Sequence, residues 1–113
     1  MNRGKFLKEK VINFTKFLTE YGIDLPDVES MPDLLIWTTM ETHLQHMDTE
    51  LLRDKRDIAL LLEQLGTAKS ALDLKKILAQ VSDKYEEMPL VARDKFWRYL
   101  ECFHECINSE PSQ

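Results

Sequence analysis

A regular pattern of apolar residues organises the middle of the chain, between residues 30 and 65. Apolar side chains recur there at alternating steps of three and four residues, with one polar member: Trp37, Met40, Leu44, Met47, Leu51, Asp54, Ile58, Leu61 and Leu65. Such a heptad pattern is typical of an amphipathic α-helix. Ser30 is suited to cap the N-terminus of this helix and Gly66 to end it. The sequence therefore predicts one long helix over residues 30–65.

The length of this predicted helix sets it apart from the others. Unbroken, it would span about 50 Å at 1.5 Å per residue, roughly twice the length of the helices predicted elsewhere. Residues 53–57 read Arg-Asp-Lys-Arg-Asp and contain no apolar side chain, so a break into two shorter helices is the alternative. Because the heptad phase continues across these residues without glycine or proline, we favour a continuous or merely kinked helix. Such a helix would project beyond its neighbours, and a homodimer through residues 30–65 would bury the overhang.

Three further helices are predicted from the same periodicity, over about residues 4–21, 67–88 and 89–107. No stretch has the alternating pattern of a strand. We therefore predict an all-α fold, an antiparallel helical bundle of four helices, or five if the long heptad-patterned helix breaks. Residues 1–107 are expected to form a single domain, and the polar residues 108–113 a disordered tail.

Composition narrows the possible classes of function. The chain has 113 residues, of which 43% are hydrophobic and 31% charged, as in a soluble globular domain. Its formal charge of −5 does not favour general binding to nucleic acid. Charged residues interrupt the N-terminal apolar positions, so neither a signal peptide nor a membrane span is predicted. Cys102 and Cys106 lie one helical turn apart, a poor geometry for a disulfide, and two free thiols indicate a cytoplasmic protein.

The charge is unevenly distributed along the chain. Residues 17–52 contain no lysine or arginine but many acids. This acidic span is either a solvated face with a loop, or a surface that contacts another protein with a basic surface. The positions that we expect to contact such a partner are Asp24, Asp27, Glu29, Asp33, Glu41 and Asp48.

No metal or other cofactor is predicted. On a helix, Cys102 and Cys106 share a face, but His104 points about 160° away from Cys102, so Cys-x-His-x-Cys cannot gather three ligands. His43 and His46 would have to join the two cysteines from another helix, and nothing in the sequence shows that these faces meet. The chain also has no glycine-rich phosphate loop and no recognisable set of serine, histidine and acid.

One short motif suggests chemistry. Arg98 and His104 form Arg-x5-His on the last predicted helix, which resembles the Arg-x4-6-His element of HEPN-type ribonucleases, a helical and commonly dimeric family. The resemblance covers these two positions, and Tyr99 stands where the family commonly has a polar residue. It implies a metal-independent endoribonuclease in which His104 acts as acid or base and Arg98 stabilises phosphate charge, in a cleft between two protomers.

Our leading hypothesis is a non-enzymatic module. We expect a small cytoplasmic protein–protein interaction protein (an adaptor, a chaperone-like protein or an inhibitory, immunity-type regulator) that acts through helix faces and an acidic surface. The HEPN-like endoribonuclease with Arg98 and His104 is the alternative.

Overall fold

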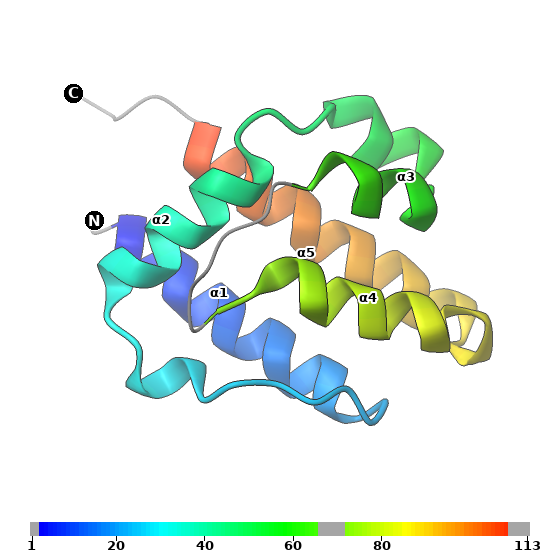
Figure 1. Ribbon diagram of the computed structural model, residues 1–113, viewed down its shortest axis with the longest axis horizontal. Helices are drawn as coiled ribbons and strands as arrows, with labels where there is room; N and C mark the ends of the chain where they lie inside the picture. The colour runs from blue at the N-terminus through cyan, green and yellow to red at the C-terminus, as the bar shows by residue number, and fades with distance from the viewer. Residues whose placement is uncertain (1–2, 66–71, 109–113) are drawn as a thin grey trace.

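The computed structural model describes residues 3–65 and 72–108, and this part of the chain is helical without strands. Its α-helices are α1 (Arg3–Thr19), α2 (Asp33–Leu44), α3 (Ile58–Gln64), α4 (Leu74–Lys84) and α5 (Leu90–Asn108) (Figure 1). Shorter segments are the 3-10 turns η1 (Val28–Ser30) and η3 (Tyr85–Glu87) and the π-helix η2 (Leu51–Lys55). The predicted all-α class is confirmed.

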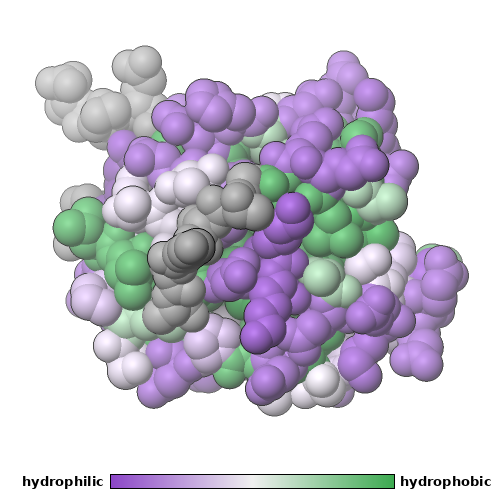
Figure 2. Space-filling model, viewed as in Figure 1, coloured by the Kyte–Doolittle hydropathy of each residue, from purple (hydrophilic) through white to green (hydrophobic). Residues whose placement is uncertain are grey.

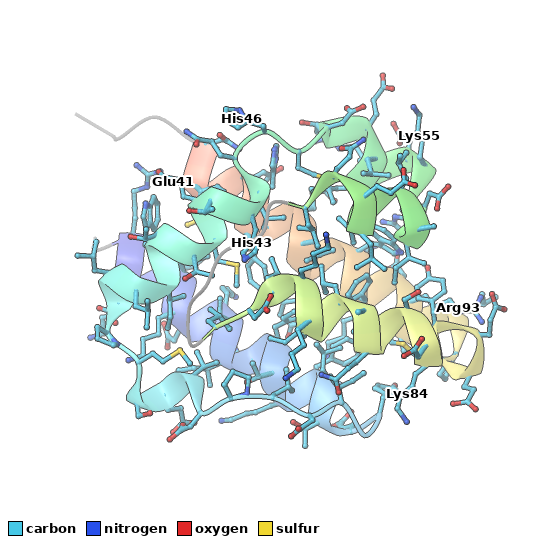
Figure 3. The ribbon with its side chains drawn as sticks, in the orientation of Figure 1. Glu41, His43, His46, Lys55, Lys84 and Arg93 are labelled. Carbon is cyan, nitrogen blue, oxygen red and sulfur yellow. The ribbon has the colours of Figure 1, made fainter. Side chains whose placement is uncertain are left out.

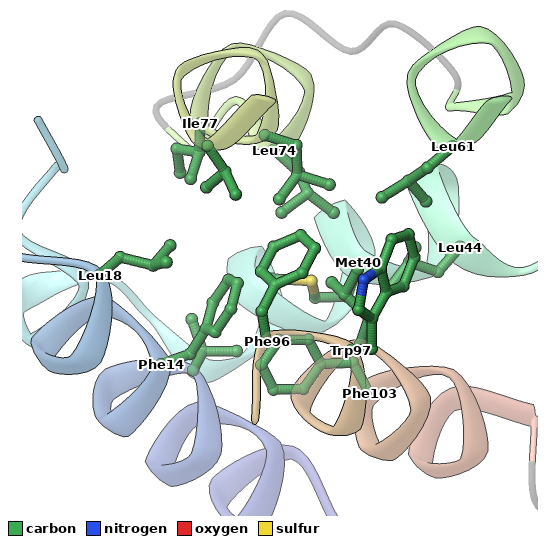
Figure 4. Close-up of a cluster of buried hydrophobic side chains, with 14 of the residues drawn as sticks. Phe14, Leu18, Met40, Leu44, Leu61, Leu74, Ile77, Phe96, Trp97 and Phe103 are labelled. Atoms are coloured by element: carbon green, nitrogen blue, oxygen red, sulfur yellow. The ribbon is translucent and has the colours of Figure 1, made fainter. Parts of the chain in front are cut away.

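Helix α5 contacts α1, α2 and η2. Its buried side chains Phe96, Trp97, Leu100 and Phe103 are at most 1% exposed. Figure 4 shows α1, α2, α3 and α4 each contributing apolar side chains around three of these residues, Phe96, Trp97 and Phe103. The indole nitrogen of Trp97 donates a hydrogen bond of 2.7 Å to the Tyr85 hydroxyl, which satisfies the polar atom of the largest buried side chain.

The prediction of one continuous helix over residues 30–65 is wrong. Helix α2 ends at Leu44, and a turn separates it from η2. Asp48 and Asp57 each accept hydrogen bonds from backbone N–H groups two or three residues later, so each carboxylate caps a new helical segment. Arg56 adopts the left-handed conformation (φ 46°, ψ 46°) between η2 and α3, where the helical path changes direction. One break lies where the sequence carries Arg-Asp-Lys-Arg-Asp, as the alternative predicted, whereas the other break, at residues 45–48, was not predicted.

Folding back buries the heptad stripe within the same chain. Six of its members are at most 5% exposed: Met40, Leu44, Met47, Leu51, Leu61 and Leu65. A long helix would have left part of this stripe in water, whereas each buried leucine or methionine contributes about 1.5–3 kcal/mol. The homodimer through residues 30–65 was predicted in order to bury the projecting part of a long helix. Because the chain folds back, this argument for a homodimer no longer applies.

Charged side chains attach η2, and Arg56 directly after it, to α5. Arg53 Nε lies 3.1 Å from Glu101 Oε1, and Arg56 Nη1 lies 2.7 Å from Asp94 Oδ1. Leu51 and Leu52 of the same segment are fully buried. The polar run in the middle of the heptad pattern is therefore the part of the chain that forms ion pairs with α5 as the chain reverses.

The ends of the chain bear on two further predictions. Asn108 is the last residue of α5, and residues 109–113 lie outside the described part, so the division into a domain 1–107 and a tail 108–113 stays a prediction. Among the described residues, none of the helices combines the length and the apolar character needed to cross a membrane.

If Asp57 is the residue that starts α3, Asp57→Ala should lower the free energy of unfolding by about 1 kcal/mol, a typical loss for a helix cap. Urea unfolding followed by circular dichroism measures the difference. Asp54→Ala is the matched control, because Asp54 is an exposed acid of η2 whose removal should change stability by less than about 0.5 kcal/mol. Equal losses in the two variants would contradict the capping role.

Candidate functional site

The connection between α1 and α2, residues 20–32, carries three of the six predicted contact residues. Near its start, Gly22 has a φ of 77°, which lets the chain turn sharply after α1. Ile23, Val28 and Met31 are 4%, 3% and 8% exposed and anchor the connection in the core. Since its apolar residues point inward, its acids are held outward on a fixed backbone.

A side-chain amide fastens the same connection to α4. The Asp24 backbone N–H donates to Gln80 Oε1 at 2.9 Å, and Gln80 Nε2 donates back to the Asp24 carbonyl at 3.0 Å. These two bonds use the backbone of Asp24 and leave its exposed carboxylate to solvent. Beside it lies a cavity of about 370 Å³, lined by residues 24–26 and by Asp73, Lys76, Ile77 and Gln80.

The acids of the connection differ in how far they are neutralised. Asp27 is exposed, and Glu29 lies 4.0 Å from Lys16 in a pair whose two side chains are 65% and 70% exposed. Such a surface pair contributes about 0–1 kcal/mol, so the Glu29 carboxylate is not committed to it. Asp24, Asp27 and Glu29 together are named here the acidic connection.

The other three predicted contact residues do not join this group. Asp33 pairs with Lys8 at 3.7 Å, and Lys8 also donates to the Met31 carbonyl at 2.6 Å. Asp48 caps the segment that leads into η2. Glu41 is half-buried on the second half of α2, away from the connection (Figure 3). The six positions therefore do not form one continuous surface.

The surface around these elements is mostly hydrophilic, with apolar areas in separate patches (Figure 2). One such patch lies at the edge of the molecule where α2 begins (Figures 1 and 2), and Leu34 in that first turn is 74% exposed. At the start of α5, Leu90 and Val91 are 77% and 81% exposed.

Arg98 and His104, the residues of the ribonuclease alternative, line different cavities. Arg98 is exposed, and its Nε lies 2.8 Å from Asp94 Oδ2. His104 is only 9% exposed and borders a cavity of about 400 Å³ together with Thr49, Glu105 and Asn108. Within one chain these two side chains do not converge on a common site.

The residues considered as possible metal ligands differ in how deeply they are buried. His43 is buried in α2 and His46 is exposed in the turn that follows (Figure 3). Cys102 and Cys106 are half-buried free thiols on α5, and burial raises the pKa of each. In residues 3–65 and 72–108, no three histidine, cysteine or acidic side chains gather as metal ligands would.

Sequence reasoning missed Asp94, which bridges two arginines. Its Oδ1 accepts from Arg56 and its Oδ2 from Arg98, and the hydrogen bond from Arg56 is the main cause of its lowered pKa. The four-residue spacing of Asp94 and Arg98 on one helix was a visible signal for the second contact. The contact with Arg56 depends on the left-handed turn at that residue, which no local pattern announced.

Part of this chain is similar in sequence to a known protein. The chain is 36% identical over 58 residues to the CST complex subunit STN1 of Aquarana catesbeiana. The match covers 51% of this chain but only 17% of that protein, so the chain spans a small part of its curated relative. No family model and no solved structure matches the chain.

If the amide of Gln80 holds the acidic connection in place, Gln80→Ala should lower the free energy of unfolding by about 1–2 kcal/mol, since it removes two hydrogen bonds. It should also speed hydrogen exchange at the Asp24 amide. Both changes are measurable by denaturant unfolding and by NMR exchange. Gln64→Ala, at an exposed position near the end of α3, should leave that amide unchanged. Unaltered exchange at Asp24 in the Gln80 variant would show that the core residues alone hold the connection.

Proposed function

We propose that this chain is a non-enzymatic protein-interaction module that binds a basic surface of another protein through the acidic connection. The observation that supports this most directly is the way the connection is built. Its backbone is fixed by three buried side chains and by Gln80, while its carboxylates face solvent. Binding residues are commonly carried on loops that a rigid scaffold positions.

The physical advantage of this arrangement lies in preorganisation. A connection that is already ordered loses little conformational entropy when a partner binds. Exposed carboxylates attract a basic surface at a distance and speed association, and the net charge of −5 acts in the same direction. The cavity beside Asp24 also contains Asp73, whose carboxylate caps α4, so Asp24 is the acid left to attract one lysine or arginine side chain of the partner, whereas Lys76 in the same cavity disfavours a run of cations.

The partial likeness supports a role in an assembly. The protein matched is, by its name, a subunit of a complex, and we infer by analogy that this chain also works bound to other proteins. An adaptor or a regulatory subunit fits this analogy. Asp33 and Asp48 already serve contacts within the chain, so we place the interface on Asp24, Asp27 and Glu29. A cytoplasmic location stays a prediction from the two free thiols.

Charge reversal tests this proposal. Tagged protein is used to capture partners from an extract of its native source at low salt, and the recovered partner is then purified for calorimetry. Asp24→Lys with Asp27→Lys should weaken its binding by about tenfold or more, because attraction becomes repulsion. Added salt should weaken the unmodified complex.

Asp54→Lys with Asp83→Lys is the matched control, because it changes the net charge equally at two exposed acids on η2 and α4. This control should retain most of the binding. Equal weakening of partner binding by both double variants would show that the effect comes from the overall charge and not from Asp24 and Asp27. An unchanged affinity in the Asp24 and Asp27 variant would place the interface elsewhere.

The ribonuclease alternative makes an opposed prediction. As an interaction module, the purified chain should leave single-stranded RNA intact, and His104→Ala should still bind the partner. Gel analysis of labelled RNA after incubation without metal ions tests the first point. Cleavage by the unmodified chain that is lost in His104→Ala and in Arg98→Ala would replace the module by an endoribonuclease, assembled from two protomers since one chain keeps these residues apart.

A further inference from the structure

A cationic pocket lies between α1 and α5, apart from the acidic connection. It has a volume of about 210 Å³ and is lined by Lys10, Lys95, Arg98, Tyr99 and Cys102. Three cations thus converge from two helices in a chain of net charge −5. The cavity beside Asp24, the cavity beside His104 and a third lined by Lys5, Lys8 and Asp33 each contain a carboxylate, whereas this pocket contains none.

The two lysines are positioned by aromatic rings. Lys10 Nζ lies 5.4 Å from the centre of the Phe6 ring, and Lys95 Nζ lies 5.1 Å from that of Phe17. A ring attracts an ammonium group without carrying a net charge, so it orders the lysine and leaves its charge for a ligand. In the described part of the chain, no carboxylate lies within 4.0 Å of either ammonium group.

Arg98 is held in a way that keeps part of its donor set available. Its contact with Asp94 Oδ2 is made through Nε at 2.8 Å, and its side chain is 74% exposed. Arginine donates through up to five N–H groups in a fixed plane, which suits the oxygens of a phosphate group.

The two remaining lining residues add no negative charge. Burial raises the pKa of the Tyr99 hydroxyl, and the neighbouring Cys102 adds to this effect. Burial is also the main cause of the raised pKa of the Cys102 thiol, which Glu105 raises further and Lys10 lowers. Both groups are therefore protonated near neutral pH, and the tyrosine hydroxyl can donate to an anion.

We propose that this pocket binds the phosphate group of a phosphorylated side chain on a partner protein. A phosphomonoester carries close to two negative charges and several acceptor oxygens, which match two ammonium groups, a guanidinium group and a hydroxyl. The pocket volume holds a phosphate together with the first atoms of its side chain. No residue is shared with the acidic connection, so this site and the proposed function can fail independently.

A single phosphate fits the observations better than a nucleic acid does. A polyanion that extends beyond the pocket also meets other faces of a chain whose net charge is −5, whereas one phosphate is attracted by the local field of the pocket. The Tyr99 ring already packs against Phe14 and Phe17, at centroid distances of 5.2 and 5.8 Å. It therefore has less free face for the base stacking typical of single-strand binding.

The test is an NMR titration of the isotope-labelled full chain with four probes. These are the capped peptide Gly-Gly-phosphoserine-Gly-Gly, its unphosphorylated twin, inorganic phosphate and a ten-nucleotide single-stranded RNA. We expect saturable shifts of the amides of residues 10 and 95–102 with the phosphopeptide, weaker binding of inorganic phosphate, and no saturation with the twin. Lys95→Gln with Lys10→Gln should weaken phosphopeptide binding by about tenfold.

Lys55→Gln with Lys75→Gln is the control, because it removes the same charge on η2 and α4, away from the pocket. The affinity of this control variant for the phosphopeptide should match that of the unmodified chain. Equal weakening in both double variants, or shifts outside the pocket only, would overturn the proposal. Inorganic phosphate binding as tightly as the phosphopeptide would identify a free anion as the ligand instead. Tighter binding of the RNA to the same residues would replace the phosphorylated protein with nucleic acid.

Discussion

The fold depends on burying the apolar face of helix α5. Helix α5 presents two phenylalanines, a tryptophan and a leucine that are almost completely removed from water, and no single neighbour is wide enough to cover them all. Phe14 of α1 packs against Phe96 and Phe103, while η2 reaches the same helix near Glu101. The chain must bring its N-terminal helix α1 and its middle segment η2 to α5, and this requirement selects a folded-back middle over a straight one.

This requirement also explains which parts of the fold the sequence could predict. The period of the apolar positions correctly indicated helices, and six of the nine members of the heptad pattern are buried, because burial in any helical bundle follows the same stripe. The period could not show that the stripe changes direction, since a chain that folds back at Arg56 keeps its heptad spacing on both sides. Asp48 and Asp57 were the local signals for the breaks, but Asp48 was predicted to contact a partner and Asp57 was treated only as part of a polar run, and neither was predicted to be a cap.

For the candidate site, too, the pattern of charges along the sequence did not predict how the acidic residues are used. A count of charges along residues 17–52 suggested one acidic surface, yet the structure divides these acids among different tasks. Asp48 caps a helical segment and Asp33 meets a lysine of α1, whereas Asp24, Asp27 and Glu29 are exposed on a backbone that buried side chains and Gln80 hold in place. Spacing along the chain could not predict the contact between Lys8 and Asp33, because it depends on how α1 packs beside the start of α2.

Net charge is a poor guide to what a particular part of this surface can bind. Screening at physiological ionic strength limits electrostatic interactions to about 8 Å, which is shorter than the distance across even a small domain. A ligand in the pocket between α1 and α5 therefore experiences mainly Lys10, Lys95 and Arg98, together with Asp94, which pairs with Arg98. The overall excess of acid therefore says little about a single anion held between two helices, because the local charge differs from one face of this chain to another.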